Sequence, residues 1–319
     1  MRTREDGGME PVTTAAHSTG STGAVPDSAR VVIIGGGVIG ASVAYHLAHL
    51  GWTDVVLLER DQLTSGTTWH AAGLIVSGGM TTETLAWMTK YSTDLYAGLE
   101  DETGLSTGFK PVGYLQTASN PERMHKLRRE ADFLRLMGID REEISAREVA
   151  DLWPHVDASD VLGGFFTASE GRAAPYNVAM SLAAGARALG VRIVQGAPVT
   201  GITQRDGRVT GVVTEHGTIE AEFVVNCAGM WARQIGAMAG VAVPLQAIEH
   251  AYLITEPFEG VSPDLPIFED PDRFAYYREE TGGLMVGLFE PVAAPWSIDR
   301  IPDDFSFGEI PSDWDRLAP

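Results

Sequence analysis

Cysteine is almost absent from this sequence: Cys227 is the only one in 319 residues, so the chain cannot form an internal disulfide. A single thiol fits a reducing compartment, and we expect a cytoplasmic protein. Basic residues are also few, since 23 Lys and Arg face 43 Asp and Glu and leave a formal net charge of −20. That excess of acid argues against nucleic acid as a partner, because the phosphates would be repelled. No apolar run is long enough to cross a membrane.

The N-terminal segment lacks the apolar core of a secretory signal peptide. It is rich in Ser, Thr, Gly and Ala, and this composition predicts a disordered leader over residues 1–29. The acidic residues gather late in the chain, where fifteen Asp or Glu and four Arg lie between Glu256 and Arg316. Such a surface would attract a cationic amine, but solubility explains it more simply.

A strand, a glycine turn, a helix and a second strand are predicted between residues 30 and 59. The short β-branched run Val31–Ile34 is typical of a buried parallel strand. Three glycines end this strand, and Val38–Leu50 then follows a helical pattern. Asp54–Glu59 is apolar except at its ends and predicts the next strand. This order is that of a nucleotide-binding βαβ unit.

The glycines of the turn have the spacing of a dinucleotide-binding site. Gly35, Gly37 and Gly40 form Gly-x-Gly-x-x-Gly, and Glu59 follows nineteen residues after the last of them. The first glycine allows a tight turn, the second lets backbone approach a pyrophosphate, and the third lets the helix pack on the strand. The helix N-terminus would bind the phosphates, and Glu59 would accept hydrogen bonds from ribose hydroxyls. A glycine-rich turn without a ligand is the alternative, which the strand–helix context disfavours.

The fingerprint does not distinguish NAD from FAD, but two later segments favour FAD. Residues 223–229 form an apolar strand that ends in small residues, where a cofactor would approach closely. Residues 196–199 begin a strand whose backbone would meet an adenine. Cys227 is interpreted as a packed small residue, since no His or Asp lies near it in sequence.

The rest of the chain alternates helical and strand patterns. Helices are expected near residues 81–98, 120–137 and 175–189, and strands near 208–213 and 218–225, with turns at Asp206-Gly207 and His216-Gly217. From Val241 onward, apolar runs broken by Pro, Gly and acidic residues indicate part of an antiparallel sheet. His46 and His49 lie on the first predicted helix without carboxylates arranged for a metal, so we predict no metal site.

The stretch Leu63–Leu74 is the most specific motif of the chain. Its sequence, Leu-Thr-Ser-Gly-Thr-Thr-Trp-His-Ala-Ala-Gly-Leu, resembles the dimethylglycine and sarcosine dehydrogenase (oxidase) family, within the D-amino-acid-oxidase superfamily of FAD-dependent oxidoreductases. The resemblance extends from Arg30 to about Glu290 and includes residues 113–116, 170–175 and 226–232. It covers the N-terminal portion of such enzymes.

This resemblance implies FAD as the cofactor, attached covalently through its 8α-methyl group to His70. A neutral imidazole is a competent nucleophile at neutral pH, so the attachment is chemically reasonable, although a hydrogen-bonded loop histidine is the alternative. The residues expected to bind the cofactor, from the fingerprint and the resemblance together, are Gly35, Gly37, Val38, Ile39, Gly40, Glu59, Arg60, Ser65, Gly66, Thr67, His70, Gly73, Val199, Ala228, Gly229 and Trp231.

The resemblance also implies two catalytic residues. His250 matches an active-site histidine after a Val-Pro-Leu segment, and Tyr276 matches the active-site tyrosine of a Tyr-Tyr-Arg-Glu motif. Hydride leaves a carbon beside nitrogen only when the nitrogen lone pair is free, so the ammonium must first lose a proton. A His–Tyr pair would position the amine and take up that proton. The alternative is that both residues are packed strand residues. Arg278 would hold a substrate carboxylate or form an ion pair with Glu279 or Glu280.

The expected fold is α/β, with a Rossmann-like FAD-binding domain and a second, mainly antiparallel-sheet substrate domain. Residues 30–80 and 170–235 are assigned to the discontinuous FAD-binding domain, and residues 81–169 and 236–319 to the substrate domain. Enzymes of the family close the FAD domain with a later strand, glycine turn and helix. We therefore expect the substrate domain to be incomplete at its C-terminus and the chain to be a truncated product or fragment.

The expected activity is FAD-dependent oxidative N-demethylation of a small N-methylated amino acid, such as dimethylglycine or sarcosine. FAD would take the hydride and an iminium would remain, with either an electron-transfer flavoprotein or oxygen as the final acceptor. Two alternatives stay open. One is a glycine- or D-amino-acid-oxidase-like enzyme with non-covalent FAD, and the other is a truncated FAD-binding fragment without activity.

Overall fold

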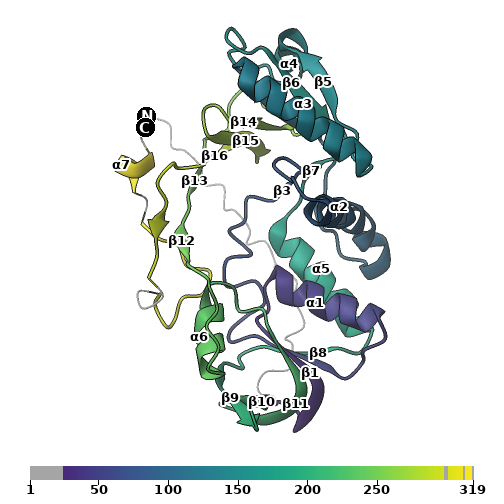
Figure 1. Ribbon diagram of the computed structural model, residues 1–319, viewed down its shortest axis with the longest axis vertical. Coiled ribbons are helices and arrows are strands. Elements are labelled where there is room, and N and C mark those ends of the chain that lie inside the picture. Colours follow the sequence, from purple (N-terminus) through teal and green to yellow (C-terminus); the bar gives the residue numbers. More distant parts are fainter. Residues whose placement is uncertain (1–23, 298–300, 312, 318–319) are drawn as a thin grey trace, which may run out of the picture.

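The computed structural model describes residues 24–297, 301–311 and 313–317. Two large sheets lie at opposite ends of an elongated molecule, with helices between them (Figure 1). The strands of the first sheet are β1 (Ser28–Ile34), β2 (Val55–Leu58), β8 (Arg192–Val194), β9 (Val199–Arg205), β10 (Arg208–Thr214) and β11 (Gly217–Asn226). Their order is β8-β2-β1-β11-β10-β9. The central β1 pairs in parallel with β2 and β11, so this is the predicted nucleotide-binding sheet.

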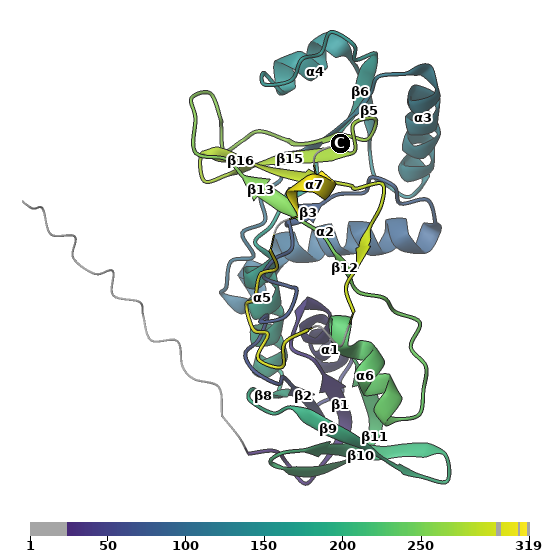
Figure 2. The same ribbon diagram turned by 90° about the vertical axis from the view of Figure 1, so that its left-hand side faces the viewer.

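Helices α1 (Val38–His49) and α5 (Pro175–Ala188) cover one face of this sheet, and α2 (Glu83–Thr103) packs against α5 (Figures 1 and 2). Val31 and Ile33 of β1 share one buried core with the alanines of α1. A Cβ on Gly185 of α5 would lie 2.8 Å from the ring of Tyr45, so α5 has a glycine where α1 approaches most closely. Burial of alternate strand residues thus holds the βαβ unit together.

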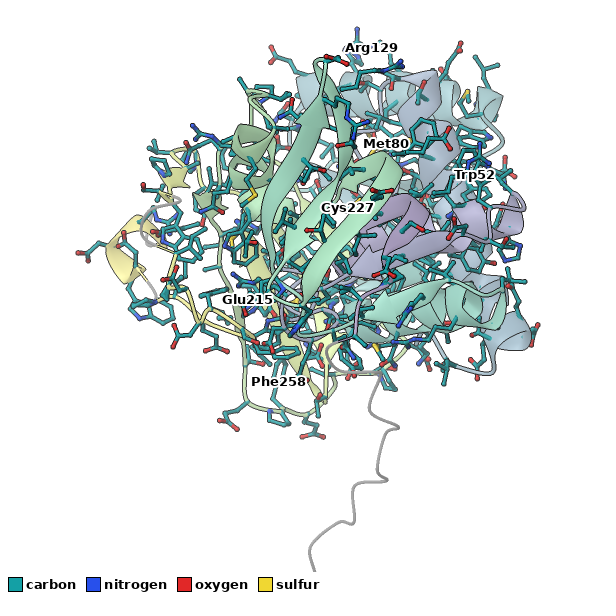
Figure 3. The ribbon with its side chains drawn as sticks, turned by 90° about the horizontal axis from the view of Figure 1, so that it is seen from below. Trp52, Met80, Arg129, Glu215, Cys227 and Phe258 are labelled. Carbon is teal, nitrogen blue, oxygen red and sulfur yellow. The ribbon has the colours of Figure 1, made fainter. Side chains whose placement is uncertain are left out.

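The antiparallel ribbon β9–β10–β11 extends the sheet, and Figure 3 shows it from below. Val32 and Val56 point away from α1 and pack with Val212 and Ile219 of the ribbon. Asp206 and Gly207, between β9 and β10, have φ values of +52° and +73°. Two successive residues with positive φ form the tight hairpin turn that the Asp-Gly pair predicted.

The second sheet has seven strands in the order β13-β16-β15-β14-β4-β6-β5. They are β4 (Tyr114–Ala118), β5 (Glu142–Ser145), β6 (Gly163–Thr167), β13 (Tyr252–Ile254), β14 (Ile267–Asp270), β15 (Ala275–Glu280) and β16 (Gly283–Leu288). Neighbours are antiparallel except for β14 and β4, which run parallel. Helix α3 (Pro121–Leu136) packs on β4 and β6, and α4 (Ala146–Leu152) on β5 and β6. Leu115 and Phe268 pack with Trp153, which follows α4, and form the core of this half.

Short elements connect the two halves. They are β3 (Leu74–Ile75), β7 (Gly171–Arg172), β12 (Ile248–Glu249), β17 (Ala294–Pro295), the 3₁₀-helix η1 (Gly229–Trp231), α6 (Ala232–Met238) and α7 (Trp314–Leu317). β3 pairs with β7, and β12 with β17. Helix α7 lies beside the β13–β16 end of the second sheet (Figures 1 and 2).

The α/β prediction is confirmed: a mostly parallel, helix-covered sheet and a mostly antiparallel sheet occupy one chain. The predicted leader, residues 1–29, overlaps β1, which begins at Ser28, and residues 1–23 lie outside the described residues. The domain boundaries stay a prediction. One observation bears on them, because α2, assigned to the substrate domain from sequence, buries Leu99 in the core of the first sheet.

Candidate active site

The turn between β1 and α1 requires glycine for two different reasons. Gly35 has φ +109°, a conformation that residues with a side chain rarely adopt. A Cβ on Gly40 would lie 1.9 Å from the carbonyl oxygen of Gly35, so the helix approaches the turn too closely for any side chain. Helix α1 has no capping side chain at Gly37 and no acidic residue in its first turn. Its positive dipole end is therefore not neutralised from within and favours an anionic ligand.

Glu59 ends the second strand beside this turn and is 8% exposed. Its Oε2 accepts a hydrogen bond from the N–H of Gly36 at 2.7 Å, and its Oε1 accepts one from the N–H of Asp61 at 3.0 Å. Burial raises the pKa of the carboxyl, and the two backbone hydrogen bonds oppose that shift. Each oxygen keeps a second lone pair, which suits it to accept a ribose hydroxyl.

A cavity of about 480 Å³ opens over the turn, at the carboxyl ends of the parallel strands. Four segments far apart in sequence line it: the β1–α1 turn, the loop after β2, the start of β9, and the segment from Cys227 into α6; Figure 3 labels Cys227. Arg60 extends across it with its guanidinium 4.0 Å from the centroid of the Trp231 ring. A crevice at this edge of a doubly wound sheet is where such folds bind nucleotides.

Most of the residues predicted to bind the cofactor line this cavity. They are Gly35, Gly37, Val38, Ile39, Glu59, Arg60, Ser65, Gly66, Thr67, Val199, Ala228, Gly229 and Trp231. Gly40, in the first turn of α1, and His70, in the loop after β2, do not line the cavity. Gly73 lies against Ala173, where a Cβ would be 2.3 Å from the carbonyl oxygen of Ala173. No local pattern predicts Gln234, Ile235 and Met238 of α6, which line the cavity only because the chain returns there.

The loop that carries His70 is covered by a distant part of the chain, Ile301–Ile310, which we call the strap. Phe307 N–H of the strap donates to the carbonyl oxygen of Ser65 at 2.8 Å, and His70 Nε2 lies 2.5 Å from the carbonyl oxygen of Gly308. The Ser306 hydroxyl donates to Asp61, and Arg60 donates to the carbonyl oxygen of Phe305. The His70 ring also packs against that of Trp69, with centroids 3.7 Å apart and the planes tilted by 37°. The strap therefore holds the whole segment from Arg60 to His70.

Arg278 joins the second sheet to the same loop. Its Nε donates to the carbonyl oxygen of Ala72 at 2.6 Å, and its guanidinium pairs with Glu280 at 2.6 Å. The side chain is 8% exposed. The ion pair with Glu280, one of the two roles predicted for Arg278, is present, with a buried guanidinium and a partly exposed carboxylate. The hydrogen bond to Ala72 makes Arg278 a tether between β15 and the residues that follow His70.

Tyr276 lies two residues before Arg278 and therefore on the same face of β15. It pairs across the ladder with Gly287, which pairs in turn with Tyr252. The Tyr276 ring lies directly over Gly287, where a Cβ would be 1.9 Å from the ring carbon Cζ. Burial raises the pKa of Tyr276 to about 12, helped by the neighbouring Tyr252 and Glu290 and opposed by Arg278. The phenol is thus protonated at neutral pH and can donate a hydrogen bond.

His250 lies between β12 and β13, two residues before Tyr252, and its side chain is 44% exposed. Its ring stacks on Phe289, with centroids 6.4 Å apart and planes 21° apart. Phe289 also contacts Tyr276, at 5.3 Å between centroids. The structure therefore brings together both predicted catalytic residues, although they are 26 positions apart in sequence, around one phenylalanine that sequence reasoning had not singled out.

A family model described as FAD dependent oxidoreductase matches residues 30–316, which include both sheets and the cavity. The chain belongs to this family. Its likeness to solved structures agrees with this: the L-proline dehydrogenase of P. horikoshii has a TM-score of 0.77 at 26% identity, over 85% of this chain and 71% of that one.

Two curated relatives illustrate the sequence similarity. One is 4-methylaminobutanoate oxidase (formaldehyde-forming) of Paenarthrobacter nicotinovorans, 37% identical over 92% of this chain and 36% of the relative. The other is mitochondrial sarcosine dehydrogenase of Homo sapiens, 38% identical over 95% of this chain and 33% of the relative. The chain thus spans about a third of the length of these relatives. The predicted resemblance to this family is confirmed.

FAD is the cofactor of this family, and the residues present fit it. Gly37 lines the cavity without a side chain, the α1 dipole favours a pyrophosphate, and Glu59 has lone pairs for a ribose. In the part of the chain that the structure describes, no three His, Cys, Asp or Glu residues gather as metal ligands, and no helix is long and apolar enough to cross a bilayer.

Proposed function

We propose that this flavoprotein catalyses oxidative N-demethylation of a small N-methylated amino acid, such as sarcosine or dimethylglycine. The observation that carries the proposal is the cluster of His250, Phe289 and Tyr276 on the sheet face that Arg278 ties to the His70 loop. The names of the relatives agree with it, since one is a sarcosine dehydrogenase and the other forms formaldehyde. The substrate would lie between this cluster and the flavin ring.

The protein's own residues would prepare the amine for oxidation. An N-methyl ammonium has no free lone pair, so it must lose a proton before its methyl group can give up a hydride. The exposed ring of His250 is suited to take that proton, and the protonated phenol of Tyr276 to orient the amine by a hydrogen bond. FAD, when bound, accepts the hydride. Water then adds to the iminium, which releases formaldehyde and the demethylated amine.

The flavin would be attached to His70, as the resemblance implies. The proposal is supported by the position of His70, on the loop that lines the cavity and two residues before Ala72, the anchor of Arg278. Attachment there would hold the ring end of FAD near the catalytic cluster, while the glycine turn holds the pyrophosphate. The final electron acceptor is either oxygen or an electron-transfer flavoprotein.

Two measurements test this proposal. The flavin of the purified protein should stay with the protein on acid precipitation, and that of His70→Ala should be released. The wild type should turn over sarcosine or dimethylglycine with release of formaldehyde. His250→Ala and Tyr276→Phe should each lower kcat/KM by about 10²-fold at unchanged flavin content.

The alternatives are separate outcomes of the same tests. Flavin fully released by acid from the wild type, with turnover of glycine or a D-amino acid but no N-methyl amine, would identify the non-covalent oxidase. Bound flavin without turnover of any amine would identify an FAD-binding chain that has no activity by itself.

A further inference from the structure

Glu290 follows β16 and lies beneath the exposed ring of His250. Its Oε2 is 3.1 Å from His250 Nδ1. The Glu290 side chain is 7% exposed, against 44% for that of His250. A carboxylate buried to this extent, directly behind a solvent-facing imidazole, has the arrangement by which a carboxylate orients a catalytic histidine.

A cation behind Glu290 holds the carboxylate in place. Arg316 of α7 lies 3.4 Å from Glu290 Oε1, on the side opposite to His250. Arg316 is 14% exposed and also pairs with Glu249 at 3.2 Å and Asp313 at 3.6 Å. Three carboxylates around one guanidinium keep Arg316 in place if one of them is removed. One oxygen of Glu290 thus contacts Arg316 and the other contacts His250.

The contact determines which ring nitrogen of His250 carries hydrogen. An ionised carboxylate can only accept hydrogen bonds, so Nδ1 must donate and the lone pair of the neutral ring is on Nε2. Phe289, adjacent to Glu290 in sequence, stacks on the same ring and limits its rotation. Glu290 also acts on Tyr276, whose pKa its charge helps to raise. The charge of Glu290 therefore acts on both residues of the pair, although only His250 is in hydrogen-bond contact with it.

We propose that Glu290 is the positioning residue of this active site: it holds the imidazole of His250 in the Nδ1–H tautomer, with Nε2 open to the proton of the substrate ammonium. The inference rests on the proposed function for the identity of that substrate. In this proposal Glu290, held by Arg316, acts through His250 and does not itself contact the substrate. When the amine proton moves to Nε2, the Glu290 carboxylate stabilises the resulting imidazolium.

The first test measures the tautomer directly and requires no substrate. In protein with ¹⁵N-labelled histidine, the long-range ¹H–¹⁵N spectrum of His250, assigned by its loss in His250→Ala, should show hydrogen on Nδ1. In Glu290→Ala the signal should shift toward the Nε2–H form, which prevails in water. Glu249→Gln is the matched control, because Glu249 contacts the same Arg316 but is not hydrogen-bonded to His250. Its His250 signal should match that of the wild type.

The second test measures kinetics with sarcosine or dimethylglycine. Glu290→Ala should lower kcat by at least about tenfold with little change in KM, because the substrate still binds but loses a well-placed base. Glu290→Gln should lie between Glu290→Ala and wild type, since its amide oxygen still accepts from Nδ1–H but carries no charge. Flavin content and the unfolding midpoint of each variant show whether it folds.

The outcomes separate the two proposals. An unchanged tautomer in Glu290→Ala overturns the positioning role, even if kcat falls, because the loss then does not act through His250. A shifted tautomer with unchanged kcat overturns it too. If the tautomer shifts in Glu290→Ala but the wild type oxidises no N-methyl amine, the positioning role of Glu290 stands and the proposed substrate class is wrong.

Discussion

At the scale of single residues, the buried phenol of Tyr276 makes stability depend on pH. Its pKa in the folded chain is raised to about 12, above the ordinary 10.0. Between these values the unfolded chain releases the phenol proton and the folded chain keeps it. The unfolded state then binds fewer protons, so rising pH favours unfolding.

We therefore expect the free energy of unfolding to fall as pH rises from about 10 to about 12, between the two pKa values, and to fall less steeply in Tyr276→Phe. Urea unfolding at several pH values measures this slope. Tyr91→Phe, at an exposed site on α2, is the control and should keep the wild-type slope. Equal slopes for the wild type and Tyr276→Phe would show that the Tyr276 phenol has the same pKa in the folded and the unfolded chain.

Single residues also explain which site predictions could come from sequence. Gly40 is required by the carbonyl oxygen of Gly35 within the same turn, and Gly35 by its own positive φ, so their spacing carries the information, although a Cβ on Gly35 would also collide with Cys227. Gly287 is a different case: it makes room for the ring of Tyr276 on the neighbouring strand. Nothing local to Gly287 indicates this, because the pairing register of β15 and β16 decides which residue lies beneath the ring.

At the scale of elements, the strap connects the late part of the chain to the loop that carries His70. It makes three hydrogen bonds to residues 60–65 and one contact with His70. Its aromatic residues add to these, since Phe305 packs on Trp231 and Trp296 and Phe307 packs on Trp69.

The strap should accordingly protect backbone amides on hydrogen exchange. We expect the N–H of Phe307, which donates to Ser65, to exchange slowly in the wild type and faster in Phe305→Ala, which loses both tryptophan contacts. Exchange measured by mass spectrometry on peptides from residues 301–310 reports this. Phe274→Ala, at an exposed phenylalanine in a distant turn, should leave those peptides unchanged. Rapid exchange of Phe307 in the wild type would mean that the strap is not docked in solution.

At the scale of the whole molecule, the cofactor cavity is assembled from four separate stretches of chain, between residues 34 and 238. A ligand that contacts all of them binds the folded chain and not the unfolded one, so binding stabilises the fold. The stabilisation should grow with free ligand, by about 2.7 kcal/mol when its concentration is 100 times Kd.

His70→Ala, in which FAD binding is expected to be reversible, is the variant for this measurement. Its unfolding midpoint should rise steadily with added FAD. FMN lacks the adenylate half that the glycine turn and Glu59 are suited to bind, so FMN at equal concentration should raise the midpoint much less. Equal effects of FAD and FMN would contradict the assignment of this cavity to the dinucleotide.

The βαβ unit, its glycine turn and Glu59 could be predicted from the amino-acid order, because they lie in one short stretch of chain. The motif around His70 likewise indicated the family. What surrounds these residues follows from the tertiary fold: α6 lies on the cavity, the strap contacts His70, and Glu290 lies behind His250. These contacts join residues 40 to 238 positions apart. Their geometry is set by strand register and by the path of the chain between the two sheets, which no local pattern of side chains encodes.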